Sequence, residues 1–273
     1  MADKKQITFR VRRFDPDTDS APHWDSYTLS VPEGMTVLEA LHQIKAEKEP
    51  TLAWRSSCRM GVCGSCGMYV NDFPMLACQT QVLHLGTDVV TVAPLPNYEN
   101  VKDLVPNLEP LIEKHAAIKP FIIHPNKKEV DEPTGEFIQT PEQREEFSQF
   151  TYCIKCGLCL AACPTVATDP EFLGPQALAQ AYRYTIDNRD CGLSERLVAI
   201  DAFHGPFQCH IAGACSMACP KGVDPALGIQ LLKRTLVLDS IGLGKKPSKA
   251  AKVMPLADVV KEIEKMAPPP RTV

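Results

Sequence analysis

The sequence predicts an α+β chain of two domains, in which a strand-rich N-terminal domain precedes an all-helical domain. Three observations support this prediction. The length of 273 residues is typical of two domains. Apolar and polar residues alternate in segments up to Pro94 and Pro96, and apolar residues recur at helical spacing after them. We therefore expect domains at 1–106 and 107–245, followed by a basic extension at 246–273.

The N-terminal half is predicted to form a small mixed sheet with one helix. Residues 7–11 and 27–31 alternate apolar and polar side chains, which indicates two half-buried strands. Thr36 and Glu39 have the spacing of a capping box and predict the start of a helix that ends before Pro50. Further short strands are expected at 68–70, 76–78 and 89–92, beyond a loop rich in glycine and cysteine at 55–67.

The C-terminal half is expected to contain helices only. Leu104, Leu108 and Leu111 recur at helical spacing, and the polar stretch 125–136 predicts a surface loop. Proline at the first helical position marks other helix starts, and a shorter helix is expected at 194–203. Those starts lie at Pro141, Pro175 and Pro225.

Charge and hydropathy exclude several functions. A net charge of −4 argues against a dedicated nucleic-acid binder, so we expect no nucleic-acid partner. The segment 233–273 holds nine Lys or Arg and four Asp or Glu. It is either a solvated face with a loose end or a contact with anionic lipid headgroups or a membrane subunit. We expect no secretory signal and no membrane span, and hence a reducing compartment for the thiols.

The first of three cysteine groups predicts a [2Fe–2S] cluster. Its spacing is C-x4-C-x2-C followed by a fourth cysteine, the plant-type arrangement. Gly61, Gly64 and Gly67 allow the backbone to wrap closely and to aim amides at sulfur. A zinc site is the alternative, although zinc favours paired C-x2-C knuckles. The predicted ligands are Cys58, Cys63, Cys66 and Cys78.

The other two groups predict a pair of clusters that exchange ligands. Residues 153–164 read C-x2-C-x2-C-x3-C-P, the bacterial ferredoxin run whose fourth cysteine binds the other cluster. Residues 209–220 follow the same template, but Ala212 replaces the second cysteine. The predicted [4Fe–4S] ligands are Cys153, Cys156, Cys159 and Cys219. The predicted [3Fe–4S] ligands are Cys163, Cys209 and Cys215.

The missing thiolate at Ala212 leaves one alternative open. The site that lacks it either loses an iron and becomes [3Fe–4S], which we favour, or keeps four irons with water or a non-cysteine ligand. Cys191 is left over and is assigned no role.

Three clusters in one chain indicate an electron-transfer path between two redox partners. The sequence has no nucleophile–base pair, no phosphate-binding loop and no GxGxxG motif, so bond-making chemistry is not expected on this chain. Substrates of such a path usually bind to other subunits.

The chain resembles the iron–sulfur subunit of the succinate dehydrogenase and quinol:fumarate reductase family, respiratory complex II. The matching stretches are SCRMGVCGSCGM with LAC at Cys78, QFTYCIKCGLCLAACP, DPEFLGPQAL and CSMACPKGVDPALGIQ. The DPEFLGP stretch is more similar to the fumarate reductase branch. The resemblance implies an N-terminal β-grasp ferredoxin-like domain and an all-α ferredoxin domain.

The resemblance also implies partners and location. Electrons would pass between FAD on a succinate/fumarate flavoprotein and a quinone, menaquinone or ubiquinone, through the [2Fe–2S], [4Fe–4S] and [3Fe–4S] clusters in that order. One or more membrane anchor subunits, with or without haem, would hold the chain at the cytoplasmic or matrix face of the inner membrane.

Four residues are candidates for the family's quinone pocket, which lies beside the three-iron cluster. Pro164 and His210 each follow one of its cysteines, and Gln230 and Lys233 lie three apart on the last long helix. Lys233 matches a lysine that the family places near the quinone. For each of these side chains, the alternative interpretation is a solvated or structural role.

Three other functions remain open at this stage. The first alternative is an iron–sulfur subunit that serves another flavoprotein, such as a thiol-linked fumarate reductase. The second is a soluble multi-cluster ferredoxin. The third alternative is a zinc-stabilised interaction module.

Overall fold

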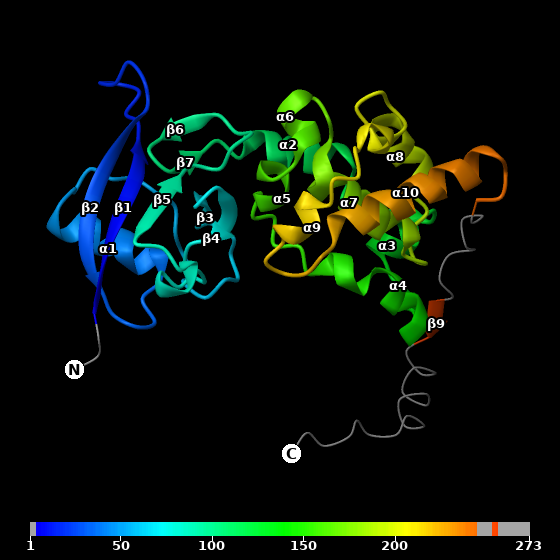
Figure 1. Ribbon diagram of the computed structural model, residues 1–273. Coiled ribbons are helices and arrows are strands. Elements are labelled where there is room, and N and C mark those ends of the chain that lie inside the picture. Colours follow the sequence, from blue (N-terminus) through cyan, green and yellow to red (C-terminus); the bar gives the residue numbers. More distant parts are fainter. Residues whose placement is uncertain (1–3, 245–252, 256–273) are drawn as a thin grey trace.

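The computed structural model describes residues 4–244 and 253–255 and divides into a strand-rich part and a helical part that lie side by side (Figure 1). The extension expected at 246–273 lies outside the described residues, apart from 253–255.

The strand-rich part is a five-stranded mixed sheet in the order β2-β1-β5-β3-β4. β1 pairs antiparallel with β2 and parallel with β5, and β3 pairs antiparallel with both β5 and β4. The strands and the helix α1 of this part are β1 (Lys5–Arg13), β2 (His23–Val31), α1 (Val37–Glu47), β3 (Gly67–Val70), β4 (Phe73–Leu76) and β5 (Val89–Ala93). A 3-10 turn, η1 (Leu83–Leu85), precedes β5.

The predicted helix start at Thr36 is confirmed. Thr36 Oγ1 accepts the backbone N–H of Glu39 at 3.2 Å, and Glu39 Oε2 accepts the backbone N–H of Thr36 at 2.8 Å. This capping box satisfies two donors that a helix start leaves unpaired. The apolar face of α1 packs with β1 in the first hydrophobic core, because the period of the helix and the alternation of the strand turn apolar side chains to one layer.

The strand expected at 76–78 was placed too late. Asn71 and Asp72 both have positive φ, 46° and 59°, and form the two-residue turn between β3 and β4. Such turns fix hairpin register, so β4 must begin at Phe73 and end at Leu76. Cys78 therefore follows the strand.

Leu104 was wrongly expected in a helix. It lies in the turn between β6 (Asn100–Lys102) and β7 (Val105–Pro106), and its side chain is buried in the first core. Pro106 disfavours helical backbone at the residue before it. The helix begins only at Glu109, with Pro110 in its first turn.

Asp103 ties this hairpin turn to the sheet. Its fully buried carboxylate accepts hydrogen bonds from Arg13 Nε at 2.9 Å and from the backbone N–H groups of Phe14 at 3.0 Å and Ala53 at 2.8 Å. The hairpin is therefore anchored to β1 and to the chain that leads into the cysteine-rich loop.

The helical part is built around α7, which packs against α10, α4 and α2. The predicted starts at Pro141, Pro175 and Pro225 are confirmed. Its helices are α2 (Glu109–Ala117), α3 (Lys127–Asp131), α4 (Pro141–Thr151), α5 (Leu158–Ala161), α6 (Pro164–Thr168), α7 (Gly174–Ile186), α8 (Leu193–Ile200), η2 (Pro206–Gln208), α9 (Ala214–Met217) and α10 (Pro225–Ser240).

The expectation of helices only in this part was wrong. The stretch predicted as a loop contains α3 and leads into β8 (Gly135–Phe137), which pairs antiparallel with β9 (Val253–Pro255). Three-residue strands carry too little alternation to be recognised, and their partner lies more than 100 positions away in sequence.

The two parts are joined through Asn97 and Tyr98. Asn97 Nδ2 donates to the carbonyl oxygens of Leu160 at 2.9 Å, Cys163 at 3.1 Å and Ala161 at 3.2 Å. Tyr98 Oη donates to the carbonyl oxygen of Gly157 at 3.0 Å. The carbonyl groups of Gly157, Leu160 and Cys163 also accept backbone N–H groups. The side-chain bonds therefore add a link between the segment around α5 and the strand-rich part.

Replacing Asn97 by alanine is expected to lower the free energy of unfolding by about 1–3 kcal/mol, because its side-chain amide donates three hydrogen bonds to the segment 160–163. Asn97 has a φ of 64°, which alone penalises alanine. Asp72→Ala is the matched control, since Asp72 has a φ of 59° and is exposed. Chemical denaturation followed by circular dichroism measures both variants. Equal losses for the two would show that the carbonyl contacts contribute nothing.

Candidate metal centres

The first cysteine group surrounds a loop whose backbone amides face sulfur. The N–H groups of Met60, Val62 and Cys63 donate to Cys58 Sγ at 3.4, 3.3 and 3.3 Å. The N–H of Gly61 donates to Cys78 Sγ at 3.2 Å. Amide dipoles aimed at sulfur stabilise negative charge there, which suits thiolate ligands of a cluster.

Two glycines of this loop, Gly61 and Gly64, have different roles. Gly61, with a φ of 69°, aims its amide at sulfur as expected, and a Cβ there would overlap the Gln79 side chain at 2.2 Å. Gly64 instead allows close packing, because its Cβ would lie 2.7 Å from Cys156 Cβ and 2.9 Å from Cys156 Cα. The loop therefore touches a cysteine of the helical part.

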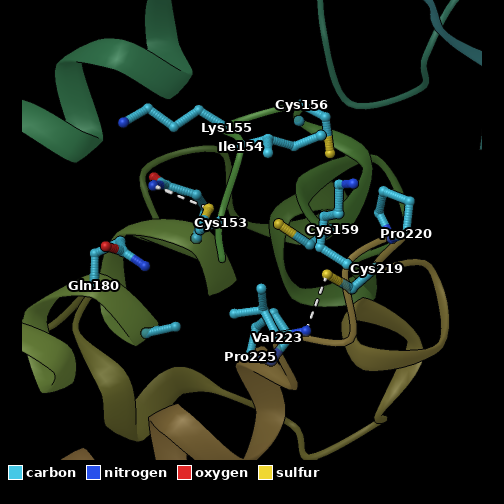
Figure 2. Close-up of a pocket in the computed structure, with 14 residues that line it drawn as sticks. Cys153, Ile154, Lys155, Cys156, Cys159, Gln180, Cys219, Pro220, Val223 and Pro225 are labelled. Carbon is cyan, nitrogen blue, oxygen red and sulfur yellow. Dashed lines mark hydrogen bonds between the residues drawn. The ribbon is translucent and has the colours of Figure 1, made fainter. Parts of the chain in front are cut away.

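The second predicted set lines a single cavity. Figure 2 shows the labelled side chains of Cys153, Cys156 and Cys159 on one stretch of chain and Cys219 on another around this cavity. Ile154, Val223 and Pro225 contribute apolar walls. The N–H of Val223 donates to Cys219 Sγ at 3.4 Å. Four sulfurs in an apolar cavity with an amide donor fit a [4Fe–4S] cluster.

The third predicted set lines a second cavity. Cys163, Cys209 and Cys215 face it together with Ala212, and the N–H of Ile211 donates to Cys209 Sγ at 3.4 Å. Cys163 of the first run lines the second cavity, and Cys219 of the second run lines the first cavity. The lining of the cavities therefore agrees with the predicted exchange of ligands. The walls of the second cavity offer three thiols and no histidine or carboxylate, a donor set that fits a three-iron cluster.

The backbone repeats between the two runs. Lys155 and Gly157 have φ of 54° and 82°, and Ile211 and Gly213 have φ of 59° and 71°. Four-residue helices follow in both runs, α5 and α9. Ala212 therefore occupies the position in the second run that Cys156 occupies in the first.

Burial makes these sulfurs costly to charge without iron. It raises the pKa of the thiols of Cys66 to about 12 and of Cys156 and Cys215 to about 11. Cys63 differs, because hydrogen bonding from Ser65 lowers its pKa to about 6. Iron binding must therefore displace protons from most of these thiols and offset the desolvation of the thiolates.

Three of the four residues expected near a quinone lie around the second cavity. Pro164 lines it, His210 follows Cys209 with an exposed side chain, and Lys233 Nζ donates to the carbonyl oxygen of Cys209 at 3.4 Å. Gln230 lies one turn before Lys233 on α10 and is not part of the cavity wall. Its buried Nε2 has no hydrogen-bond partner among the described residues.

Sequence reasoning missed Gln176, which contacts a predicted ligand. Its Nε2 lies 3.8 Å from Cys153 Sγ. The sequence offers no signal for it, because Gln176 and Cys153 lie on different elements. Cys191, which received no role, donates its backbone N–H to the carbonyl oxygen of Ile123 at 2.7 Å.

Two findings apply to the described part of the chain. No three His, Cys, Asp or Glu side chains in it are arranged to hold a single metal ion. None of its helices combines the length and apolar character needed to cross a bilayer.

Comparisons with known proteins agree with the cysteine groups. Residues 8–113 match the 2Fe-2S iron-sulfur cluster binding domain family, and residues 149–223 match the 4Fe-4S dicluster domain family. The fumarate reductase iron-sulfur subunit of Escherichia coli O6:H1 is 44% identical over 230 residues, which cover 84% of this chain and 93% of that protein. The succinate dehydrogenase iron-sulfur subunit of Paracoccus denitrificans is 38% identical over 231 residues, with coverages of 84% and 87%.

A solved structure is also similar. A chain of the Mycobacterium smegmatis Sdh1 complex in the apo form superposes with a TM-score of 0.73 at 30% identity, over 87% of this chain and 97% of that chain.

Ala212→Cys is expected to convert the predicted three-iron site into a [4Fe–4S] site, because it restores the missing thiol at the repeated backbone position. The measurement is electron paramagnetic resonance (EPR) of the oxidised protein, in which the three-iron signal should disappear. Ala214→Cys, two positions along the same cavity wall, is the control and should leave the signal intact. A three-iron signal at full intensity in Ala212→Cys would contradict the ligand assignment.

Proposed function

The chain belongs to the family of succinate dehydrogenase and fumarate reductase iron–sulfur subunits, and on this premise we propose how its residues hold three clusters between two partners. It is the electron-transfer subunit of an oxidoreductase whose flavin site lies on another chain. The observation that carries the proposal is the contact between Gly64 and Cys156, which brings two cysteine loops from different parts of the molecule together.

Three ligand sets are assigned, and the lining of the two cavities supports the second and third of them. Cys58, Cys63, Cys66 and Cys78 hold [2Fe–2S], Cys153, Cys156, Cys159 and Cys219 hold [4Fe–4S], and Cys163, Cys209 and Cys215 hold [3Fe–4S]. When bound, each cluster supplies a site that takes up and gives off one electron at a time. The chain's own contribution is to exclude water with apolar walls and to direct amide N–H groups at sulfur.

The positions of Cys159 and Cys163 support the helical part as the connection between the loop of the first cysteine group and the second cavity. Cys159 lies in α5 on the wall of the first cavity, and Cys163, directly after α5, lies on the wall of the second. Asn97 binds the carbonyl groups between them and so holds this segment against the strand-rich part. The segment from α5 to Cys163 thereby connects the three ligand sets.

The two ends carry exposed apolar side chains that suit two different partners. Met60 and Val62 on the first loop are 69% and 54% exposed, and this end is assigned to a FAD-containing succinate/fumarate subunit. Phe207, Ile211 and Met217 beside the second cavity are also exposed, and this end is assigned to one or more membrane anchor subunits, with or without haem. The chain is then peripheral on the cytoplasmic or matrix face of the inner membrane.

The quinone, menaquinone or ubiquinone, is assigned to the second end. Pro164, His210 and Lys233 surround Cys209 there, and the unpartnered amide of Gln230 lies one turn away on α10. A lysine beside an apolar opening supplies a charged donor for a quinone oxygen.

A fold is also proposed for each of the two parts. A mixed sheet covered by one helix, with β1 parallel to β5, supports a β-grasp ferredoxin-like domain over 1–106. The region 107–245 is assigned as a ferredoxin-like helical domain, with the small β8–β9 ladder added to it.

The proposal is tested at the contact that carries it, with Gly64→Ala in the assembled complex. The added methyl must displace the first loop from Cys156. Succinate should then reduce the predicted three-iron site, which lies beyond this contact, more slowly, because a longer separation between redox sites slows electron transfer. Freeze-quench EPR measures the rate.

Gly34→Ala is the matched control for this experiment. Gly34 has a φ of 82° and open space around its Cβ position, so it carries the backbone strain without the clash. Unchanged rates in Gly64→Ala, or equal slowing in both variants, would refute the role of the contact.

Lys233→Ala is expected to slow quinone-linked turnover about tenfold to a hundredfold, the worth of one hydrogen bond to a charged group. Succinate oxidation with an artificial dye should stay intact. Arg234→Ala is the control, because the next residue on α10 is exposed. Quinone kinetics equal to those of the unmodified protein would remove Lys233 from the site.

A further inference from the structure

Gln176 lies in the first turn of α7 with its side chain against a predicted cluster ligand. The residue is 2% exposed, and its Nε2 lies 3.8 Å from Cys153 Sγ and 3.1 Å from His115 Nδ1. We propose that Gln176, oriented by His115, donates a hydrogen bond to the Cys153 sulfur and thereby raises the reduction potential of the [4Fe–4S] cluster. This inference rests on the proposed function, since it requires that Cys153 bind iron.

The orientation of the amide follows from its neighbours. A glutamine amide has two N–H donors, and here Nε2 lies within hydrogen-bonding distance of both the Cys153 sulfur and His115 Nδ1. The opposite orientation would direct the carbonyl oxygen at a negatively charged thiolate and leave the imidazole nitrogen facing oxygen. The structure therefore favours the amide with nitrogen toward Cys153.

His115 is suited to hold this orientation. Burial, aided by the nearby charge of Lys155, lowers its pKa to about 4, so the ring is neutral near pH 7. A neutral imidazole has one unprotonated nitrogen, and Nδ1 in this role accepts the second N–H of Gln176. His115 lies on α2, so two helices fix the position of the donor.

Stability alone does not account for a glutamine at this position. Its Oε1 is buried and has no hydrogen-bond partner among the described residues. A buried carbonyl without a donor destabilises a fold, and an apolar side chain of the same length would avoid that cost. The N–H directed at sulfur is the property that an apolar residue cannot supply.

The effect on potential follows from electrostatics. Reduction adds negative charge to the cluster and its sulfurs, so a donated hydrogen bond stabilises the reduced form more than the oxidised form. The apolar walls of the cavity screen this interaction little, which increases its effect. The dashed line at Cys153 in Figure 2 marks the contact.

Gln180 provides a matched control one turn further along α7. It lines the same cavity, is 7% exposed, and donates its Nε2 to the carbonyl oxygen of Phe150 at 2.8 Å. Replacing it removes a buried amide hydrogen bond of the same kind from the same helix without removing a donor to sulfur.

The test is an EPR-monitored redox titration of the assembled complex with Gln176→Met, Gln176→Ala and Gln180→Met. Both Gln176 variants should lower the equilibrium constant for [4Fe–4S] reduction by up to about tenfold, which is about 59 mV for a one-electron couple. The potentials of the other two clusters should stay unchanged, as should all three in Gln180→Met. An unchanged [4Fe–4S] potential in the Gln176 variants, or an equal shift in Gln180→Met, would overturn the proposal.

A second measurement detects the donor directly. Pulsed EPR of the reduced complex carrying glutamine labelled with ¹⁵N in its side-chain amide should detect a coupling to the cluster that Gln176→Met removes and Gln180→Met keeps. The absence of this coupling, or its persistence in Gln176→Met, would also overturn the proposal. Failure of the proposed function has a different signature, because the unmodified complex would then lack the [4Fe–4S] signal altogether.

Discussion

The cost of burying negatively charged sulfur governs the structure of this chain. Burial holds the thiols of Cys66, Cys156 and Cys215 well above their ordinary pKa, so each is a neutral thiol near pH 7 unless iron replaces the proton. Iron then has to be accompanied by donors, because a thiolate in an apolar cavity is otherwise unsatisfied. The turns at Gly61, Ile211 and Val223 supply backbone N–H groups, and Gln176 adds a side-chain donor at Cys153.

The same requirement explains how the two parts of the molecule meet. Leu158 and Ala161 of α5 belong to the first hydrophobic core although they lie between cysteines of the helical part. Asn97 and Tyr98 bind carbonyl groups around this segment, and Gly64 has no side chain to separate the loops. The interface therefore contains side-chain hydrogen bonds to the α5 segment, and it lacks a side chain at Gly64, where the cysteine loops touch. Both features shorten the separation between redox sites, which is what an electron-transfer subunit requires.

A repeated backbone with one changed side chain distinguishes the two clusters of the helical part. The runs around Cys156 and Ala212 share their positive-φ positions and their four-residue helices. One backbone arrangement therefore builds both cavities, which differ in the thiol that Cys156 supplies and Ala212 lacks. This division places the three-thiolate site at the end with exposed Phe207 and Ile211, away from Met60 on the first loop. The chain thus has chemically different ends, as two unlike partners require.

The sequence by itself determined the cysteine spacings, the family resemblance and the capped start of α1, because ligand spacing and the capping box at Thr36 depend on neighbours a few residues apart. Only the tertiary structure decided the register of β4, the hairpin at Leu104, the β8–β9 ladder and the partnership of Gln176 with Cys153. These features depend on residues from distant segments or on turns whose φ values override periodicity, as at Asn71 and Asp72. Local patterns contain no information about which distant donor will meet a given sulfur, since that is fixed by how α2 and α7 pack.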